Sequence, residues 1–176
     1  MLADDQQEIR EAVNSILSTE FKVIRNAEDG RHALELAVNL KPDILVLDIS
    51  MPVVNGLEAA FQLKRKASHI RIVFLTVHTD PEFVEAALAT GALGYVLKAF
   101  VAAEVVPAIW AALHGEIFIS QRINLPETTR EKTEKTSTTS LFRRSHIEGL
   151  WQCPPVLDSQ RNYQRLLRLA RAEPVI

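Results

Sequence analysis

Short apolar runs alternate with helix-like segments along the first 120 residues of this chain. A continuous apolar run is typical of a strand that is covered on both faces, as in a parallel sheet, whereas apolar residues spaced by three and four predict a helix. By these criteria we predict strands at 21–25, 44–48, 71–76 and 94–97, and helices at 31–40, 55–66, 81–89 and 102–114. Strands that alternate with helices of about ten residues indicate a doubly wound α/β fold.

The regular alternation ends near residue 120. Residues 126–140, PETTREKTEKTSTTS, contain no aliphatic side chain, and a segment of this composition cannot bury enough apolar surface to fold. Residues 141–176 carry scattered apolar side chains and one helical pattern at 163–172. We therefore predict a compact domain at 1–120, a flexible linker at 121–140 and a non-standard tail at 141–176 that is partly helical or disordered.

Charge is divided unevenly between these parts. Residues 1–120 hold 10 Lys and Arg against 16 Asp and Glu, a net charge of −6, whereas residues 121–176 hold 10 against 6, a net charge of +4. No apolar run approaches the roughly 18 residues that a membrane helix needs. The single cysteine, Cys153, cannot form an internal disulfide, which fits a reducing compartment. We predict a cytoplasmic protein without a membrane segment.

Polar residues with related chemistry stand where the predicted strands end. Reading each strand to its carboxyl end gives Asp48, Thr76 and Lys98, and the pair Asp4-Asp5 stands near the start of the chain. Because ligands of open α/β sheets bind beyond the carboxyl ends of the strands, we expect these side chains to share one crevice. Carboxylates this close repel one another, and oxygen ligands in such numbers suit a hard cation that keeps several waters, above all Mg²⁺.

These side chains provide the parts of a phosphoryl-transfer site. Lys98 supplies a counter-charge and Thr76 a hydroxyl donor around one carboxylate. Asp48 is then the natural nucleophile, because an ionised aspartate can attack phosphorus to form an acyl phosphate. Taken singly, each residue is usually a turn former, a helix cap or solvated surface, and only the whole set favours a site. A magnesium-dependent phosphohydrolase would typically place a second acid two residues later, where Ser50 stands instead.

Four motifs surround these residues: ADD at 3–5, DILVLDISMPVVNG at 43–56, VFLT at 73–76 and GALGYVLK at 91–98. Together they resemble the receiver domain of bacterial two-component response regulators, over about residues 2–120. GALGYVLK and HGEIFIS are most similar to the subgroup that usually carries a LuxR-type helix-turn-helix output. The resemblance implies a flavodoxin-like (βα)5 fold with strand order 2-1-3-4-5, and Mg²⁺-dependent transfer of a phosphoryl group from a histidine kinase.

The resemblance also assigns roles to the residues of the crevice. Asp48 matches the phosphoacceptor, Lys98 the family's lysine and Thr76 the switch hydroxyl. The implied metal ligands are Asp5, Asp48 and the backbone carbonyl of Ile49, with Asp4 acting indirectly. Such a domain is not an enzyme in the ordinary sense, since its own side chain receives the phosphoryl group and loses it slowly.

Switching, in this family, would involve Tyr95 as the switch aromatic. A phosphoryl group adds about −1.5 to −2 charges and three acceptor oxygens, to which Thr76 and Lys98 can donate, and Tyr95 can then fill the space that Thr76 vacates. The face made by the fourth helix, fifth strand and fifth helix would change shape and could bind a partner or a second copy of the chain. Candidates for tuning the lifetime of the acyl phosphate and the access of small donors are Ser50, Val77 and His78.

The chain departs from the family pattern at both ends. Only Met1, Leu2 and Ala3 precede the acidic pair, so we expect a truncated first strand, unpaired ladder groups on its neighbours, and further apolar residues upstream of Met1. Residues 121–176 show no pair of helices with a recognition face, and DNA binding by this chain alone is not the favoured interpretation. Two alternatives stay open: a pseudo-receiver interaction module that is not phosphorylated, and a DNA-binding transcriptional regulator that acts through its tail.

Overall fold

The computed structural model of this chain describes residues 1–67 and 69–123. Within them, six strands form one parallel sheet in the order β2-β1-β3-β4-β5-β6. The strands are β1 (Leu2–Ala3), β2 (Asn26–Ala27), β3 (Ile44–Leu47), β4 (Arg71–Thr76), β5 (Gly94–Leu97) and β6 (Phe118–Ile119). The helices are α1 (Gln7–Leu17), α2 (Gly30–Leu40), α3 (Gly56–Lys66), α4 (Pro81–Ala89) and α5 (Val101–His114), and a 3-10 turn (Lys98–Phe100) joins β5 to α5.

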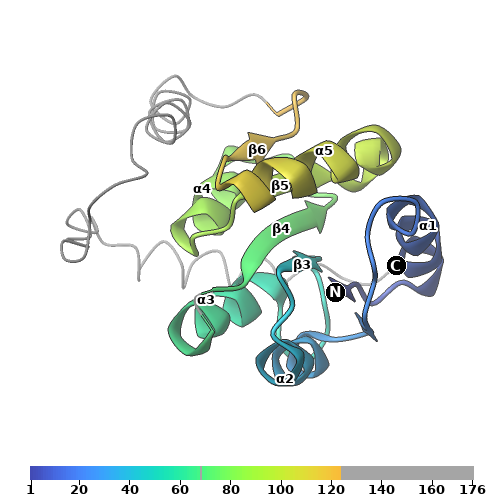
Figure 1. Cartoon of the computed structure of the whole chain (residues 1–176). Coiled ribbons are helices and arrows are strands. Elements are labelled where there is room, and N and C mark those ends of the chain that lie inside the picture. The colour runs from blue at the N-terminus through green and yellow to red at the C-terminus, as the bar shows by residue number, and fades with distance from the viewer. Residues whose placement is uncertain (68, 124–176) are drawn as a thin grey trace, which may run out of the picture.

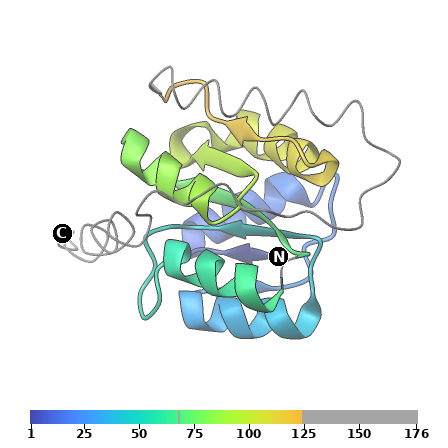
Figure 2. The same cartoon turned by 90° about the vertical axis from the view of Figure 1, so that its left-hand side faces the viewer.

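The helices cover both faces of the sheet. Helices α1 and α5 lie on one face, and α2, α3 and α4 lie on the other (Figure 1). Figure 2 views the molecule from the side of α2, α3 and α4, with α1 behind the sheet. Alternate residues of β3 serve the two cores: Leu45 and Leu47 belong to the core under α2, α3 and α4, whereas Ile44 and Val46 belong to the core under α1 and α5. The continuous apolar run of β3 is therefore explained by burial on both faces.

Capping residues set the helix boundaries. The side chains of Asp29 and Asn55 each accept a backbone N–H from the first turn of the helix that follows, α2 and α3 respectively. Pro81 occupies the first turn of α4, where its missing N–H has no partner to lose. Gly115, with φ of +79°, ends α5 in the left-handed conformation that glycine adopts without strain. The strands at 44–48, 71–76 and 94–97 and all four predicted helices agree with the structure to within one residue.

The first strand is short but paired on both sides. Backbone hydrogen bonds join this segment to both neighbours, among them Val46 N–H to Met1 O (3.0 Å), Asp48 N–H to Ala3 O (2.9 Å), Leu2 N–H to Arg25 O (3.1 Å) and Asp4 N–H to Ala27 O (3.2 Å). The prediction of a shortened first strand is confirmed. The expected loss of ladder partners on its neighbours is wrong for these residues, because extended chain on either side of β1 continues the ladder.

The second strand lies later in the chain than the predicted 21–25. Phe21 and Val23 pack against the core under α1 and α5, and Ile24 packs against the opposite core. The alternating apolar pattern therefore reports burial on both faces. A strand also needs a partner for its ladder, and β1 supplies one only to Asn26 and Ala27.

Two elements, α1 and β6, had no residues assigned to them from the sequence. Val13 and Leu17 of α1 are buried four residues apart, which is the spacing that the other helices also show. Strand β6 pairs in parallel with β5 and extends the expected order 2-1-3-4-5 by one edge strand. The flavodoxin-like fold is otherwise confirmed.

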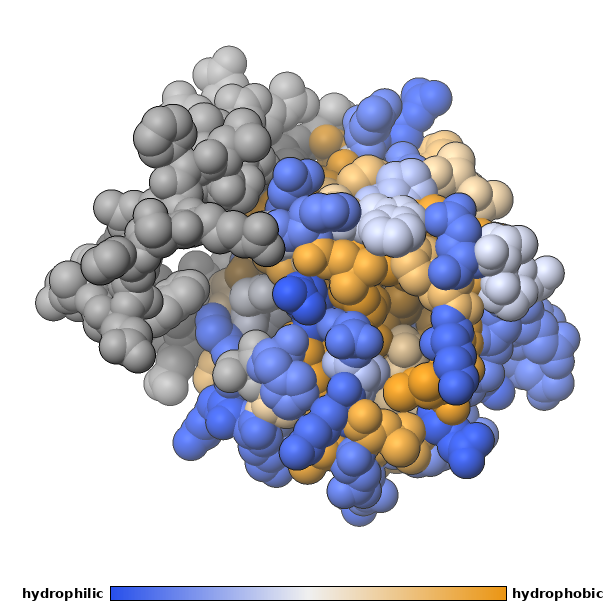
Figure 3. Space-filling model, viewed as in Figure 1, coloured by the Kyte–Doolittle hydropathy of each residue, from blue (hydrophilic) through white to orange (hydrophobic). Residues whose placement is uncertain are grey.

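The surface of the domain carries many polar side chains (Figure 3), and its packed chain extends a little beyond residue 120. In the view of Figure 3, polar side chains cover much of the surface, with apolar patches between them. No described helix is long and apolar enough to cross a bilayer. Ile123 is buried and donates its N–H to Ser120 O at 3.1 Å, so packed chain continues past the predicted boundary at residue 120. The predicted tail at 141–176 and the linker beyond Ile123 lie outside the described residues.

Candidate functional site

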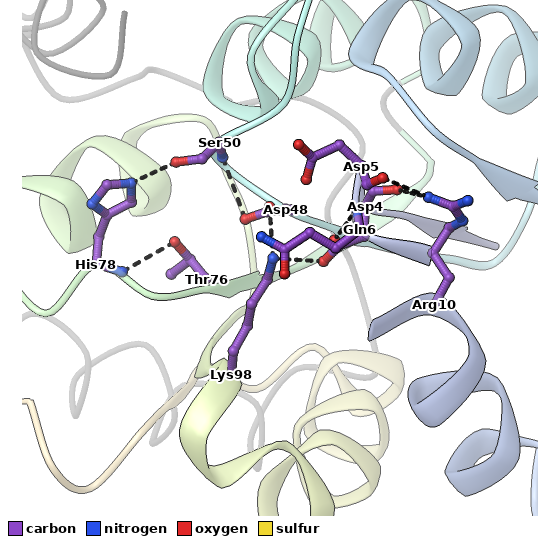
Figure 4. A network of polar contacts seen from close by, with 9 residues as sticks. All are labelled: Asp4, Asp5, Gln6, Arg10, Asp48, Ser50, Thr76, His78 and Lys98. Atoms are coloured by element: carbon purple, nitrogen blue, oxygen red, sulfur yellow. Dashed lines mark hydrogen bonds and ion pairs between the residues drawn. The ribbon is translucent and has the colours of Figure 1, made fainter. Parts of the chain in front are cut away.

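The carboxyl ends of neighbouring strands bring the predicted acids and the lysine together. Asp4 and Asp5 follow β1, Asp48 follows β3, Thr76 ends β4, and Lys98 follows β5. Figure 4 shows Lys98 reaching from the start of the 3-10 turn to the two buried acids. Its Nζ lies 2.8 Å from Asp48 Oδ2 and 2.8 Å from Asp4 Oδ2. The topology thus places these groups in one crevice, as the sequence predicts.

Burial governs the electrostatics of this crevice. The side chains of Asp4, Asp48 and Lys98 are 0%, 2% and 8% exposed. Burial raises the pKa of Asp48 to about 6; the Lys98 ammonium partly offsets this rise, and the charge of Asp4 adds to it. Burial lowers the pKa of Lys98, but the two carboxylates outweigh this effect, so that its pKa is raised overall. The crevice holds three acids, Asp4, Asp5 and Asp48, against the single ammonium of Lys98.

The acids also fit a divalent cation. Asp4, Asp5 and Asp48 each offer a carboxylate oxygen, and these three oxygens lie within 4.8 Å of one another. All three donors are hard oxygens, which suit Mg²⁺, and a cation would offset the charge that Lys98 leaves unbalanced. Asp5 is exposed, whereas Asp4 is buried and held by Lys98. Asp5 and Asp48 would therefore hold the ion directly, and Asp4 would act through its neighbours.

The backbone oxygen of Ile49, a predicted metal ligand, is engaged by backbone N–H groups of the chain itself. This oxygen accepts the N–H of Gly56 at 2.8 Å and that of Met51 at 3.2 Å, which occupies both lone pairs inside the protein. The cause is the close approach of α3 to the segment after β3. A Cβ built on Gly56 would lie 1.9 Å from Asp48 O, so that only glycine permits this contact. The start of α3 thus takes the carbonyl that the resemblance assigned to the metal.

Two of the predicted tuning residues meet beside Asp48. Ser50 donates its N–H to Asp48 Oδ1 at 3.3 Å, and its Oγ lies 2.7 Å from Nε2 of His78. The ring of His78 stacks on Phe83 of α4 with centroids 4.1 Å apart. This side-chain contact joins the loops that follow β3 and β4 next to Asp48. The third tuning candidate, Val77, is 64% exposed.

The two predicted switch residues are connected through the backbone of His78. Thr76 Oγ1 accepts the N–H of His78 at 3.3 Å, and the Tyr95 hydroxyl donates to the carbonyl of His78 at 3.1 Å. Thr76 and Tyr95 are both fully buried. Burial raises the pKa of Tyr95 well above its ordinary value, so that its hydroxyl stays protonated and remains a donor.

Arg10 is a residue of the site that was missed from the sequence. Its Nη1 donates to Asp4 O at 2.7 Å and to Asp5 O at 3.0 Å, which fixes the backbone of the acidic pair from α1 (Figure 4). Gln6 adds a backbone N–H to Asp4 Oδ1 at 3.0 Å. The signal for Arg10 was its place one and a half turns after the acidic pair on an amphipathic helix, and that helix had no assigned residues.

Comparison with known proteins gives consistent relatives. Residues 1–109 match the family model described as the response regulator receiver domain. The transcriptional regulatory protein DegU of Brevibacillus brevis is 36% identical over 125 residues, which are 70% of this chain and 53% of DegU. This chain therefore spans about half the length of that relative.

Solved structures show the same likeness. The signal receiver domain of the putative response regulator NarL from Mycobacterium tuberculosis aligns at 32% identity with a TM-score of 0.63, over 65% of this chain and 94% of that one. A chain of the CheX–CheY–BeF3–Mg complex from Borrelia burgdorferi aligns at 25% identity with a TM-score of 0.60, over 62% of this chain and 84% of that one.

Proposed function

This chain belongs to the response regulator receiver family of two-component systems, and we propose that it accepts a phosphoryl group on Asp48 from a histidine kinase. The observation that carries the proposal is the meeting of Asp48, Asp4 and Lys98, with both Nζ–Oδ2 distances at 2.8 Å, at the carboxyl edge of the sheet. A structural ion pair needs one carboxylate for one ammonium. The additional acids, including exposed Asp5, are explained by a site that takes up a cation and a phosphoryl group.

The two oxygens of Asp48 are suited to different tasks. Oδ2 is paired with Lys98, whereas Oδ1 has a single long contact with the N–H of Ser50. Oδ1 is therefore the freer oxygen to attack phosphorus. The P–O bond to Asp48 forms, the P–N bond to the donor histidine breaks, and the donor imidazole takes up a proton from solvent. Lys98 can then donate to a phosphoryl oxygen, and bound Mg²⁺ would offset the charge that builds up between the acids and the phosphoryl group.

The chain acts in this scheme as a substrate rather than as an enzyme with turnover. Its switch would start at Thr76, whose hydroxyl accepts the N–H of His78 and can donate its own proton to a phosphoryl oxygen. Tyr95 is bonded to the carbonyl of the same residue, so that a shift of this loop reaches β5 directly. We expect the face of α4, β5 and α5 to respond by binding a partner or a second copy of the chain. Size-exclusion chromatography with and without beryllofluoride tests the second possibility.

Phosphoryl acceptance is tested by intact-mass spectrometry after incubation with acetyl phosphate and Mg²⁺. We expect the mass gain of one phosphoryl group, which is absent without the metal and absent in Asp48→Asn. Asp43→Asn is the matched control, because Asp43 is exposed and precedes β3 at the opposite edge of the sheet. A chain that shows no mass gain and does not bind beryllofluoride would be the pseudo-receiver instead.

The remaining partners are proposals that rest on relatives. DegU is named a transcriptional regulatory protein, which supports a role of this chain in transcription regulation. DNA binding through residues 141–176 would require duplex binding that falls steeply with salt and is lost when those residues are deleted. We place the phosphoryl transfer in the cytoplasm, in line with the single cysteine of the chain.

A further inference from the structure

The edge strand β6 ends beside the site with an irregular hydrogen bond. Phe118 donates its N–H to Leu93 O at 2.8 Å, and Ser120 donates its N–H to Tyr95 O at 2.9 Å. A parallel ladder repeats every two residues, so the next bond would run from the N–H of Leu97 to the carbonyl of Ser120. Leu97 donates instead to the side-chain oxygen of Ser120, at 3.3 Å.

The reason lies in the turn that follows β6. The carbonyl of Ser120 accepts the N–H of Ile123 at 3.1 Å, and Ile123 is buried. The hydroxyl of Ser120 therefore takes the place of its own carbonyl as the acceptor for Leu97. The same hydroxyl donates to Oε2 of Glu104 in the first turn of α5. Its proton and its acceptor position are both used, although the residue is only 1% exposed.

Leu97 links this arrangement to the site. The register of the sheet pairs Leu97 with Thr76 on β4, and Lys98 follows Leu97 directly. Thr76, Leu97 and Ser120 thus lie next to one another at the carboxyl ends of β4, β5 and β6. The backbone that carries Lys98 is held by the proposed switch strand on one side and by Ser120 on the other.

We propose that Ser120, fixed by Glu104, is a positioning residue that couples Lys98 to the path of the chain as it leaves the sheet. The proposal rests on phosphoryl acceptance by Asp48. A phosphoryl group that draws Lys98 and the end of β4 inward shortens the 3.3 Å contact between the N–H of Leu97 and the Ser120 hydroxyl, and the turn at the end of β6 responds.

This coupling is reciprocal by thermodynamic linkage. The factor by which the contact between Ser120 and Leu97 favours phosphoryl binding equals the factor by which phosphoryl binding favours that contact. The state of the site then reaches residues 121–123 through the edge of the sheet, without passing through the surface of α4. These residues are thus connected to Asp48 by two side chains, those of Ser120 and Lys98.

The test is a titration of the full chain with beryllofluoride at saturating Mg²⁺. Ser120→Ala should weaken beryllofluoride binding about two- to tenfold, the range that one hydrogen bond supports. Ser120→Thr and Glu104→Gln keep the hydroxyl and its acceptor and should bind within about twofold of the unchanged chain. Ser18→Ala is the matched control, because the hydroxyl of Ser18 donates only to Ser15 O, near the end of α1.

Hydrogen exchange supplies the second measurement. In the unchanged chain, beryllofluoride should alter exchange of the Leu97 amide and of the amides at 118–123, and in Ser120→Ala the response at 118–123 should be lost. Equal affinity and equal exchange in the two chains would show Ser120 to be a structural cap only, and would overturn the coupling while leaving phosphoryl acceptance intact. Failure of the unchanged chain to bind beryllofluoride overturns both proposals.

A second variant tests the proposal if Ser120→Ala does not fold. If Ser120→Ala is unfolded, Glu104→Ala removes the acceptor of the Ser120 hydroxyl from the exposed side of the contact. Its beryllofluoride affinity should fall by a similar factor, and unchanged affinity in that variant overturns the proposal.

Discussion

Replacing Asp48 by asparagine should stabilise the folded domain when no divalent cation is present. Burial raises the pKa of Asp48 from its ordinary value of 3.8 to about 6, the charge of Asp4 adds to the rise, and Lys98 offsets only part of it. A shift of about two pKa units corresponds to about 3 kcal/mol that the ionised form costs the folded state. Asparagine has the same shape and keeps an acceptor for the N–H of Ser50, but Lys98 loses one of its two carboxylate partners. We therefore expect a net stabilisation of about 1–2 kcal/mol at neutral pH.

The pH dependence of the free energy of unfolding checks the direction of the predicted stabilisation. Asp48 binds its proton more tightly in the folded state than in the unfolded state, because its pKa is raised on folding. Below about pH 3.8 both states are protonated and there is no penalty; the penalty grows from there to about pH 6 and is complete above it. The advantage of Asp48→Asn should therefore be largest at neutral pH and shrink as the pH falls from 6 toward 4.

Urea denaturation followed by far-ultraviolet circular dichroism measures the effect, first with a chelator and then with Mg²⁺. Mg²⁺ should stabilise the unchanged chain by mass action, since it binds the folded state, and this response should be lost in Asp48→Asn. Glu35→Gln, which changes an exposed acid of α2, should match the unchanged chain in both buffers. The reasoning is refuted if Asp48→Asn is less stable than the unchanged chain without the metal, or if Mg²⁺ stabilises the two chains equally.

Four further substitutions probe the same region. Val53 is 65% exposed and has φ of +68°, which is strained for a β-branched residue, so Val53→Gly should raise the free energy of unfolding by about 0.5–1 kcal/mol in urea without changing beryllofluoride affinity; an unchanged or lower stability contradicts the strain. Lys98→Met leaves buried acids without an ammonium and should lower stability by about 3 kcal/mol in thermal melts, and Mg²⁺ should restore part of it; a neutral effect would show that the ion pair carries little. Ser50→Ala and His78→Ala each remove the contact between the two loops, so both should shorten the lifetime of the acyl phosphate on Asp48, followed by mass spectrometry after removal of the donor. The double variant should be no faster than either single one, whereas additive effects would show that the two residues act separately.

The strands and helices that were predicted correctly share one physical property. The middle strands β3, β4 and β5 are buried on both faces. Such burial requires an uninterrupted apolar run, which can be recognised directly in the sequence. Strand β2 differs because hydrogen bonding, rather than burial, decides where it begins. Phe21 and Val23 are partly buried against the core yet lie outside the ladder, since β1 offers partners only to Asn26 and Ala27. Burial can be predicted from residue types, whereas the partner of a strand in the ladder depends on the tertiary structure.

The residues of the site also differ in whether the sequence alone could identify them. Asp4, Asp48 and Lys98 could be predicted to meet, because the carboxyl ends of parallel strands fall on one edge whatever the details of packing. Ile49 could not be judged from the sequence, since the partners of its carbonyl depend on how closely α3 approaches after Gly56. Arg10 could not be predicted for a similar reason. Its hydrogen bonds go to backbone oxygens, which every residue has, so no residue type in the sequence points to them.

The site also supports the fold that carries it. Strand β1 consists of Leu2–Ala3, and a strand this short has few ladder bonds with which to keep its central place in the sheet. The residues just after it are held by side chains instead: Lys98 reaches Asp4 from the 3-10 turn after β5, and Arg10 holds the carbonyls of Asp4 and Asp5 from α1. The ion pair of the proposed phosphoryl site therefore also fixes the end of the central strand. Because one ammonium serves both tasks, any event that draws Lys98 away from Asp4 must loosen the end of β1, and the amide of Asp4, which donates to Ala27 O, should report it by faster hydrogen exchange when the acceptor is occupied.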